Sequence, residues 1–392
     1  MRPYTLILSP KFFPIEDGLG RYTYEFFEAL KRELPEGSVQ VLTSNNDQIF
    51  EATKSWEGIF PIVGKWKFWH LRQCFKTLSK KSKPERVLVQ YVPTMYGPWG
   101  GINFSFIFFL WYLRWIQRVK LQVMYHELHY PLLGDLKSLV IFSAHILMLV
   151  GSGGAANQLY GSTAYNTRFL KKLFFGLKRK VFHLPVGSNV TVSPISEAEK
   201  NERRKKIAPH GEMILGCFGT FHPSKNYPLI IQTLSDFLAS GGAALKLVFV
   251  GATTEDILKN LPTMLQASAK KFVVGTGFLS IEEVSHTLQI MDGFVAYFID
   301  GATTRRASML AALQHGVPVL STTEARGDEL FKGLNFMTLL HHEPKLFSIQ
   351  MTHALKQGWP LKQKKQGVEP IVQFYDAHFS WDILAKSYIS YG

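Results

Sequence analysis

The chain alternates short apolar runs with amphipathic segments over nearly its whole length, and this rhythm limits its possible folds more than any other feature. In the first half, apolar runs of strand length occur at Thr5–Leu8, Val39–Leu42, Val87–Tyr91, Gln122–Tyr125 and Val181–Leu184. Between them lie helical patterns such as Tyr22–Leu34, where apolar residues recur at helical spacing. This alternation favours parallel sheets covered by helices on both faces.

The same rhythm starts again in the second half. Its apolar runs are Met213–Gly219, Lys246–Gly251, Lys271–Thr276, Gly293–Ile299 and Val317–Thr322. Between the two series lies the Pro/Gly/Ser cluster 184–189, which is typical of a domain boundary, followed by a charged stretch over 197–206. With 392 residues the chain exceeds the roughly 250–300 residues at which one core stops growing. We therefore expect two doubly wound α/β domains whose strand ends face a common cleft.

The charge of the chain favours an anionic partner. Its formal net charge is +14 and its pI is about 9.5, which suits a nucleotide diphosphate or an anionic lipid surface. The cations concentrate in Lys65–Arg86, Arg114–Lys120 and Arg168–Lys180, with aromatic residues among them. Two interpretations stay open: solvated helix faces and a peripheral membrane face. No nucleic-acid-binding signature occurs, so nucleic acid is not an expected partner.

Membrane spans and a disulfide framework are not expected. The two most apolar runs, Ile102–Trp115 and Ser138–Gly151, contain Arg114 and His145 and fall short of the ~20 apolar residues of a span. The two cysteines of the chain do not form a metal or disulfide pattern. No secretory signal precedes the first apolar run. We therefore expect a cytoplasmic protein, peripheral on the inner face of the membrane if the basic half binds lipid.

Two stretches of the first half carry candidate chemistry directly after predicted strands. In the stretch 16–21, Gly18 and Gly20 would let backbone amides approach a ligand at a helix N-terminus, although a plain tight turn is the alternative. After the strand ending at Tyr125 come His126 and His129, which can donate to a sugar hydroxyl or a phosphate or can be structural. No third ligand is spaced to complete a metal site, so no metal is expected.

Two stretches of the second half carry phosphate-binding chemistry. In the first, Gly219 and Thr220 precede Lys225, a point charge at a helix start. The second is a loop with hydroxyls and two arginines before an apolar helix, which could form a phosphate cradle. Its candidate binding residues are Asp300, Thr304, Arg306 and Ser308, and Arg305 is a candidate catalytic residue. Solvated surface residues are the alternative for both stretches.

Together these residues resemble the retaining GT-B glycosyltransferases of glycosyltransferase family 4. The resemblance covers nearly the whole chain and is more secure from about Leu215 onward. Six features occur in the family's order: Gly18–Gly20, His126, the Leu-Pro-Val-Gly at 184–187, Gly219–Lys225, the Gly-Val-Pro-Val at 316–319, and the terminal segment Phe379–Ile383.

The resemblance implies a GT-B fold with an acceptor-side Rossmann-like domain over 1–186, joined by a crossover helix at 377–392, and a donor-binding domain over 187–376. Gly18 and Gly20 would approach the donor diphosphate, His126 would face the donor sugar, and Lys225 would neutralise the leaving group. It also implies a retaining, hexosyltransferase-like transfer from a nucleotide sugar, without metal or another cofactor. The acceptor would be a glycan or a lipid-linked intermediate of polysaccharide biosynthesis.

The chain departs from the family pattern in the donor site. Thr220 replaces the usual arginine, and the paired glutamates are missing, with Thr303 and Ala311, or Asp300 and Ser308, at their places according to the alignment. We expect Arg305 or Arg306 to replace the missing arginine and Ser308 to bind phosphate. The main alternative function is a non-catalytic GT-B subunit that binds a nucleotide sugar or glycan. A nucleotide-sugar epimerase or a phosphorylase is a third.

Overall fold

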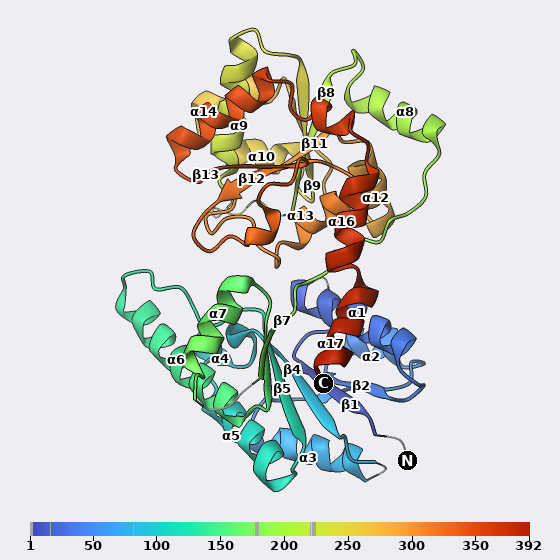
Figure 1. Ribbon diagram of the computed structural model, residues 1–392, viewed down its shortest axis with the longest axis vertical. Coiled ribbons are helices and arrows are strands. Elements are labelled where there is room, and N and C mark those ends of the chain that lie inside the picture. Colours follow the sequence, from blue (N-terminus) through green and yellow to red (C-terminus); the bar gives the residue numbers. More distant parts are fainter. Residues whose placement is uncertain (1–2, 16, 81, 177–179, 220, 222–224) are drawn as a thin grey trace. The chain divides into compact units, whose positions relative to one another are not determined.

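The computed structural model describes residues 3–15, 17–80, 82–176, 180–219, 221 and 225–392. The chain forms two compact units, each built on its own parallel sheet (Figure 1). Unit 1 comprises Met1–Gly187 and Trp381–Gly392, and unit 2 comprises Ser188–Ser380. The chain therefore builds unit 2 without interruption and then returns its last helix to unit 1.

The sheet of unit 1 has seven strands among the described residues, and all neighbouring strands are parallel. They are β1 (Thr5–Ser9), β2 (Val39–Ser44), β3 (Ile59–Val63), β4 (Arg86–Tyr91), β5 (Lys120–Tyr125), β6 (Gln158–Gly161) and β7 (Lys180–His183). Their order across the sheet is β3-β2-β1-β4-β5-β6-β7. Five coincide with apolar runs predicted from the sequence, whereas β3 and β6 are additional.

Helices cover both faces of this sheet. They are α1 (Gly18–Glu33), α2 (Asp47–Thr53), α3 (Phe68–Ser79), α4 (Pro98–Gly101), α5 (Phe104–Trp111), α6 (Leu136–Ala155), α7 (Ala164–Leu173) and α17 (Trp381–Tyr391). Alternate strand residues such as Leu6 and Val89 share a core with α3, α5 and α6. On the other face α17 packs along α1, and Tyr388 Oη donates to Gln122 Oε1 at 2.5 Å.

Unit 2 repeats this architecture with a parallel sheet of six described strands. They are β8 (Met213–Phe218), β9 (Leu245–Val250), β10 (Val273–Gly275), β11 (Gly293–Ala296), β12 (Val319–Thr323) and β13 (Met337–His341), in the order β10-β9-β8-β11-β12-β13. Its helices are α8 (Glu197–Ile207), α9 (Tyr227–Ala239), α10 (Thr254–Lys259), α11 (Thr263–Ala269), α12 (Ile281–Gln289), α13 (Ala307–Gln314), α14 (Pro344–Lys356), α15 (Leu361–Lys364) and α16 (Glu369–Phe379). The strand β13 was not among the predicted runs.

Both sheets have the same strand order when strands are counted from the first of each unit. In each, the first strand pairs with the second and with the fourth: β1 lies between β2 and β4, and β8 lies between β9 and β11. The chain connections diverge at that point, and ligands of doubly wound sheets bind beyond the carboxyl ends of the strands there. The fold therefore directs attention to the loops after β1, β4, β8 and β11.

The longest apolar helix, α6, is longer than the sequence analysis predicted. Ser138–Gly151 is part of the 20-residue helix α6, whose mean hydropathy of 1.7 would allow it to cross a membrane by length and composition. However, 44% of its most apolar window is buried inside the protein. The fully buried His145 in its middle contacts the carbonyl of Gly100 through Nε2 at 2.9 Å. In this structure α6 therefore packs as one helix of unit 1.

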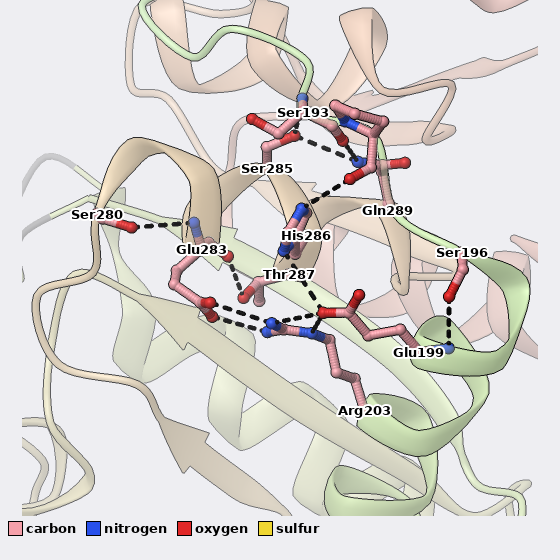
Figure 2. Close-up of polar contacts among 11 residues, drawn as sticks. Ser193, Ser196, Glu199, Arg203, Ser280, Glu283, Ser285, His286, Thr287 and Gln289 are labelled. Atoms are coloured by element: carbon pink, nitrogen blue, oxygen red, sulfur yellow. Dashed lines mark hydrogen bonds and ion pairs between the residues drawn. The ribbon is translucent and has the colours of Figure 1, made fainter.

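The segment that begins unit 2 is fixed to α12 (Figure 2). Ser285 Oγ accepts from the amide of Ser193 at 2.8 Å, and Gln289 Nε2 donates to the carbonyl of Ser193 at 2.7 Å. Beyond it, the charged stretch over 197–206 forms most of α8. Arg203 of α8 binds both carboxylate oxygens of Glu283 at 2.7 and 3.0 Å. Paired charges one helical turn apart along α8 add to its stability.

A buried carboxylate closes the base of the unit 2 sheet. Asp292, which precedes β11, receives two hydrogen bonds from Arg204 at 2.9 and 3.0 Å, one from Lys364 at 2.9 Å and one from the amide of Ile214 at 2.8 Å. Burial alone would raise the pKa of Asp292, but Arg204 and Lys364 hold it below its usual value. The cluster connects α8, β8, β11 and α15.

We expect Asp292→Ala to destabilise unit 2 by about 2–4 kcal/mol, because removing one partner leaves Arg204 and Lys364 uncompensated while both remain partly exposed. Since the folded pKa of Asp292 is depressed, its contribution is fully present above the unfolded value of about 3.9 and is lost as the pH falls through the folded pKa. Urea unfolding at several pH values measures both effects. Glu197→Gln, on the exposed side of α8, is the control; an equal loss in both variants would contradict the prediction.

Candidate functional site

The predicted site residues fall into two groups, one in each unit. Gly18, Gly20 and His126 belong to unit 1, whereas Gly219, Lys225 and the 300–308 loop belong to unit 2. Thr220 lies outside the described residues. The second group follows β8 and β11, between which its sheet reverses strand order. In the first group, Gly18 and Gly20 follow β1 at the reversal, whereas His126 follows β5, one strand beyond it.

Gly18 and Gly20 lie in the first turn of α1. Asp17 caps this helix, and its Oδ1 accepts from the amide of Gly20 at 3.2 Å and from the preceding amide at 2.8 Å. A carboxylate therefore already satisfies amides that were expected to meet the diphosphate. A methyl group on Gly20 would lie 3.3 Å from the backbone of Phe12 and of Ile15, whereas one on Gly18 would meet no atom within 4 Å. Only Gly18 has open space for a ligand.

His126 directly follows β5 and is oriented by two neighbouring elements. Its Nε2 lies 2.8 Å from Oε1 of Gln90 on β4, and the ring of Tyr22 on α1 contacts it edge to face at 4.5 Å. Because an amide oxygen only accepts, this contact assigns the proton to Nε2. The ring is thus held with a defined tautomer at the carboxyl end of the sheet. The sequence analysis did not identify Gln90 or Tyr22.

His129 does not join His126. Its Nδ1 contacts the carbonyl of its neighbour Tyr130 at 2.9 Å, and its ring packs against Phe142 of α6. Among the residues that the structure describes, no group of three or more His, Cys, Asp or Glu side chains is placed to hold a metal ion.

Lys225 turns back over the end of β8. Its Nζ donates to the carbonyl of Phe218 at 3.1 Å and lies 5.8 Å from the centre of the Tyr227 ring. Burial lowers the pKa of the Lys225 ammonium, Cys217 opposes this, and Arg306 lowers the pKa further. A bound anion would compensate this partly desolvated cation.

The two arginines of the 300–308 loop gather around one carboxylate. Asp300 forms an ion pair with Arg305 at 3.2 Å and a second one with Arg306. The Arg306 guanidinium also lies over the Phe298 ring, 4.4 Å from its centre. Two guanidinium groups thus share the Asp300 carboxylate, and the charge of Arg306 also acts on Lys225. Asp300 therefore orients the arginines in this structure.

The N-terminus of α13 opens onto the same place. Arg306 occupies the cap position of this eight-residue helix, and no side chain among the described residues caps its amides. An uncapped helix N-terminus attracts negative charge. Ser308 of its first turn and Lys225 both line one small hollow beside the ends of β8 and β11.

Thr303 and Thr304 lie inside the loop. Thr304 is fully buried, and its amide and hydroxyl both donate to Asp328 Oδ2, at 2.6 and 2.8 Å. Its observed role is therefore to fix the shape of the loop. The hydroxyl of the equally buried Thr303 has no partner within the described residues.

A carboxylate that the sequence analysis missed lies beside this loop. Glu324 follows β12, and a methyl group on Gly301 would lie 3.2 Å from its Cβ. Its Oε2 is buried and has no hydrogen-bond partner in the described part of the chain. Only the pairing of β12 with β11 brings Glu324 to Gly301, and no local motif marks it.

No protein-family model matches the chain, and no curated protein sequence matches it either. Solved structures do. Sucrose-phosphate synthase from Thermosynechococcus elongatus aligns with 99% of this chain and 98% of its own at a TM-score of 0.69 and 15% identity. HepE from Anabaena, solved with UDP and glucose, aligns over 99% of both chains at a TM-score of 0.66 and 11% identity. WaaG, a glycosyltransferase involved in lipopolysaccharide biosynthesis, aligns over 98% of both chains at 0.62 and 16%.

The chain has the GT-B fold. Alignment over nearly the full length of these structures, together with two parallel sheets of Rossmann strand order, establishes this architecture. The return of α17 to unit 1 agrees with the predicted crossover of the C-terminal helix. Because the identities are low, the likeness shows the fold and not the activity.

Gly219→Ala should displace Lys225 in addition to straining the backbone. Gly219 has a φ of +107°, and an added methyl group would lie 2.4 Å from Lys225 Nζ. We expect a loss of about 1–2 kcal/mol of stability from the strain, and weaker binding of inorganic pyrophosphate from the displaced lysine. Gly241→Ala is the matched control, because φ is +79° there and no atom lies within 4 Å of the added group. Urea unfolding and calorimetric titration measure the two effects; unchanged pyrophosphate binding in Gly219→Ala would contradict the prediction.

Proposed function

We propose that this chain is a retaining, metal-independent glycosyltransferase, hexosyltransferase-like, that moves a sugar from a nucleotide-sugar donor to a glycan or lipid-linked acceptor. The observation that carries the proposal is the positively charged pocket after β8 and β11. Lys225 and Ser308 line a small hollow there at the uncapped N-terminus of α13, and the loop that precedes this helix carries two arginines paired with Asp300. The GT-B fold supports the proposal, because its similar structures include named glycosyltransferases.

The chemical task of this pocket is to stabilise a leaving group. When the bond between the anomeric carbon and the diphosphate breaks, negative charge grows on a phosphate oxygen. Preorganised cations and helix dipoles aimed at that oxygen stabilise the transition state more than the ground state. Lys225 Nζ, the arginines released from Asp300 and the amides of α13 supply this charge from the protein itself, the role that a divalent cation has in other transferases.

UDP is the first donor base to test, because HepE was solved with UDP and with UDP-glucose. His126 is proposed to face the donor sugar, as the resemblance to family 4 implies. Its ring is already oriented by Gln90 and Tyr22, so it could donate from Nε2 only after that contact is exchanged for a substrate oxygen. Retention of configuration and family 4 membership rest on the same resemblance.

Glu324 is proposed to supply the carboxylate that the donor ribose requires. The paired glutamates of the resembling family are absent here, and the residues at their places are either the buried Thr303 and Ala311 or Asp300 and Ser308, according to the alignment. Glu324 reaches the same loop from β12 with a carboxylate oxygen that has no partner among the described residues. Burying an unsatisfied carboxylate oxygen is costly, so a pair of ribose hydroxyls would be favourable donors to it.

One observation favours the non-catalytic alternative. Asp300 engages both arginines, so the cluster is partly closed on itself without an anion. A subunit that binds nucleotide sugars without transferring them would bind UDP-glucose but show neither transfer nor slow hydrolysis of it. Release of UDP from UDP-sugars, measured with a pool of glycan and lipid-linked acceptors, separates the two functions.

Lys225→Gln should weaken UDP binding by roughly 10- to 150-fold, the value of a charge-assisted hydrogen bond of about 1.5–3 kcal/mol. Because the pKa of Lys225 is lowered, the wild-type affinity should be highest below that pKa and should fall at an alkaline pH below the usual lysine value of about 10.4. The variant should lack this alkaline decrease. Calorimetric titration from pH 7 to 10 measures it.

Lys332→Gln, at an exposed ion pair with Glu329, is the control for Lys225→Gln. A variant that binds UDP like the wild type at pH 7 would refute the assignment of the phosphate site. Binding that is lost in Lys225→Gln without any turnover in the wild type would favour the non-catalytic alternative.

Glu324→Gln should weaken binding of UDP by about tenfold and leave binding of inorganic pyrophosphate unchanged, because only UDP carries ribose hydroxyls. A hydrogen bond from a hydroxyl to a carboxylate contributes about 1.5–3 kcal/mol to the binding free energy. Glu329→Gln, on the same segment but exposed, is the matched control. Equal losses for UDP and pyrophosphate would show that Glu324 supports the loop and does not bind ribose.

A further inference from the structure

Helix α5 and the π-helical turn that continues it expose one apolar stripe. The stripe consists of Phe104, Phe108, Trp111 and Trp115, which are spaced by three or four residues and therefore lie on one side of the helix. Phe108 and Trp115 are 65% and 61% exposed, and the rings of Trp111 and Trp115 stack on each other. The opposite side of α5 is buried in the core of unit 1.

Helix α6 exposes a second stripe of the same kind. It consists of Leu136, Leu139, Val140, Leu147 and Val150, again at helical spacing. Leu147 in its middle is 62% exposed. The side toward the protein carries the buried residues of α6, including His145 and Met148. Each helix is thus apolar on both sides, which a helix on a water-facing surface usually avoids.

The two stripes form one surface, because α5 and α6 pack against each other (Figure 1). A methyl group on Gly151 would lie 2.7 Å from Ile107, and one on Gly154 would lie 3.3 Å from the ring of Trp111. Small residues on α6 therefore bring the helices close together. Two exposed flanking segments add to the surface, namely Trp99 before α5 and the dipeptide 132–133 before α6. We call this surface the α5–α6 face.

The surroundings of the α5–α6 face are positively charged. From Pro98 to Ile116 and from Leu136 to Ala155 the chain contains Arg114 and Lys137 and no carboxylate. The longer stretch from Gly58 to His126 holds eleven lysines and arginines and a single carboxylate, Glu85, which pairs with Lys120 at 2.8 Å.

The cations beside the α5–α6 face lie close to aromatic rings. Arg114 lies 5.6 Å from the ring centre of Trp115. On α3, which packs against α5, Arg72 lies 5.8 Å from the ring centres of Trp69 and Tyr112. Tryptophan and tyrosine with flanking lysine and arginine are characteristic of the region where a bilayer meets water.

We propose that the α5–α6 face binds in the plane of an anionic phospholipid bilayer, with its aromatic and aliphatic side chains in the headgroup region and its cations against lipid phosphates. An exposed apolar patch of this extent marks an interaction site. A second copy of this chain is a poor partner, since self-association would bring like charges together on a chain of net charge +14. Anionic lipid complements the charge and the apolar stripes.

This inference goes beyond the proposed transfer reaction. The face lies on the side of the sheet that α3, α5 and α6 cover, whereas Gly18 belongs to α1 on the other side. It adds the exposed apolar residues of α5 and α6 to the basic segments Lys65–Arg86 and Arg114–Lys120, which made a membrane face an open interpretation of the sequence. Membrane binding can therefore be tested without any turnover.

The test is flotation of the full-length protein with vesicles of phosphatidylcholine alone or with 30% phosphatidylglycerol. We expect the protein to float with the anionic vesicles, less so at high salt, and little with phosphatidylcholine. The triple variant Phe108→Ser, Trp115→Ser, Leu147→Ser should bind at least tenfold more weakly. Lys137→Gln alone should weaken binding by roughly fivefold, because one cation near the surface contributes that much.

The matched control is the triple variant Met264→Ser, Phe278→Ser, Ile349→Ser in unit 2, where the native side chains are 86%, 80% and 65% exposed. It should float like the wild type. Thermal unfolding verifies that both triple variants fold, which their exposure favours. Equal flotation of both triple variants, or no flotation of the wild type, overturns the proposal. A wild-type dimer in light scattering that only the α5–α6 variant disrupts, without vesicle binding, would assign the face to self-association instead.

Discussion

The strand order of the two sheets is the constraint on which the rest of the structure depends. In each unit the first strand pairs with the second on one side and with the fourth on the other, so the connections after these strands leave in opposite directions. Backbone amides and helix N-termini beside these diverging connections do not all form hydrogen bonds with a neighbouring strand. Lys225 after β8 and the arginine loop after β11 owe their placement to this arrangement, and His126 lies one strand away from it, after β5. The strand order therefore sets where the candidate site residues lie, and the side chains at those positions set the chemistry.

The charged pocket of unit 2 is held by carboxylates that do not themselves bind a phosphate. Asp328 fixes the loop through Thr304, Asp300 orients Arg305 and Arg306, and Asp292 connects the base of the same sheet to α8 and α15. Lys225, by contrast, is partly desolvated: its pKa is lowered, and its ammonium donates to a neutral carbonyl. Such local instability is typical of sites that become satisfied only when their ligand binds.

Unit 1 uses the two faces of its sheet differently. One face is closed by α1 and α17, with the hydrogen bond from Tyr388 to Gln122 fixing the returning C-terminal helix. The other is covered by α3, α5 and α6, which bury one side and leave the other side apolar and exposed. This second layer explains why the most apolar segments of the sequence are neither ordinary core helices nor simple membrane spans. One side of α5 and α6 packs against the rest of unit 1, and the exposed apolar side is the one proposed to contact a bilayer.

The sequence by itself determined the repeated α/β rhythm, most strands, the place where unit 1 gives way to unit 2 and the stretches that carry the charged loops, because hydrophobic period and glycine or proline turns are local properties. It did not reveal β3, an edge strand that contains Pro61, or β6, which has four residues, since short or interrupted runs carry little periodic signal. Only the tertiary structure decided that Thr304 is buried against Asp328 and that Glu324 lies beside Gly301. Those contacts join residues from separate strands, and strand pairing, which no local pattern encodes, sets their distance.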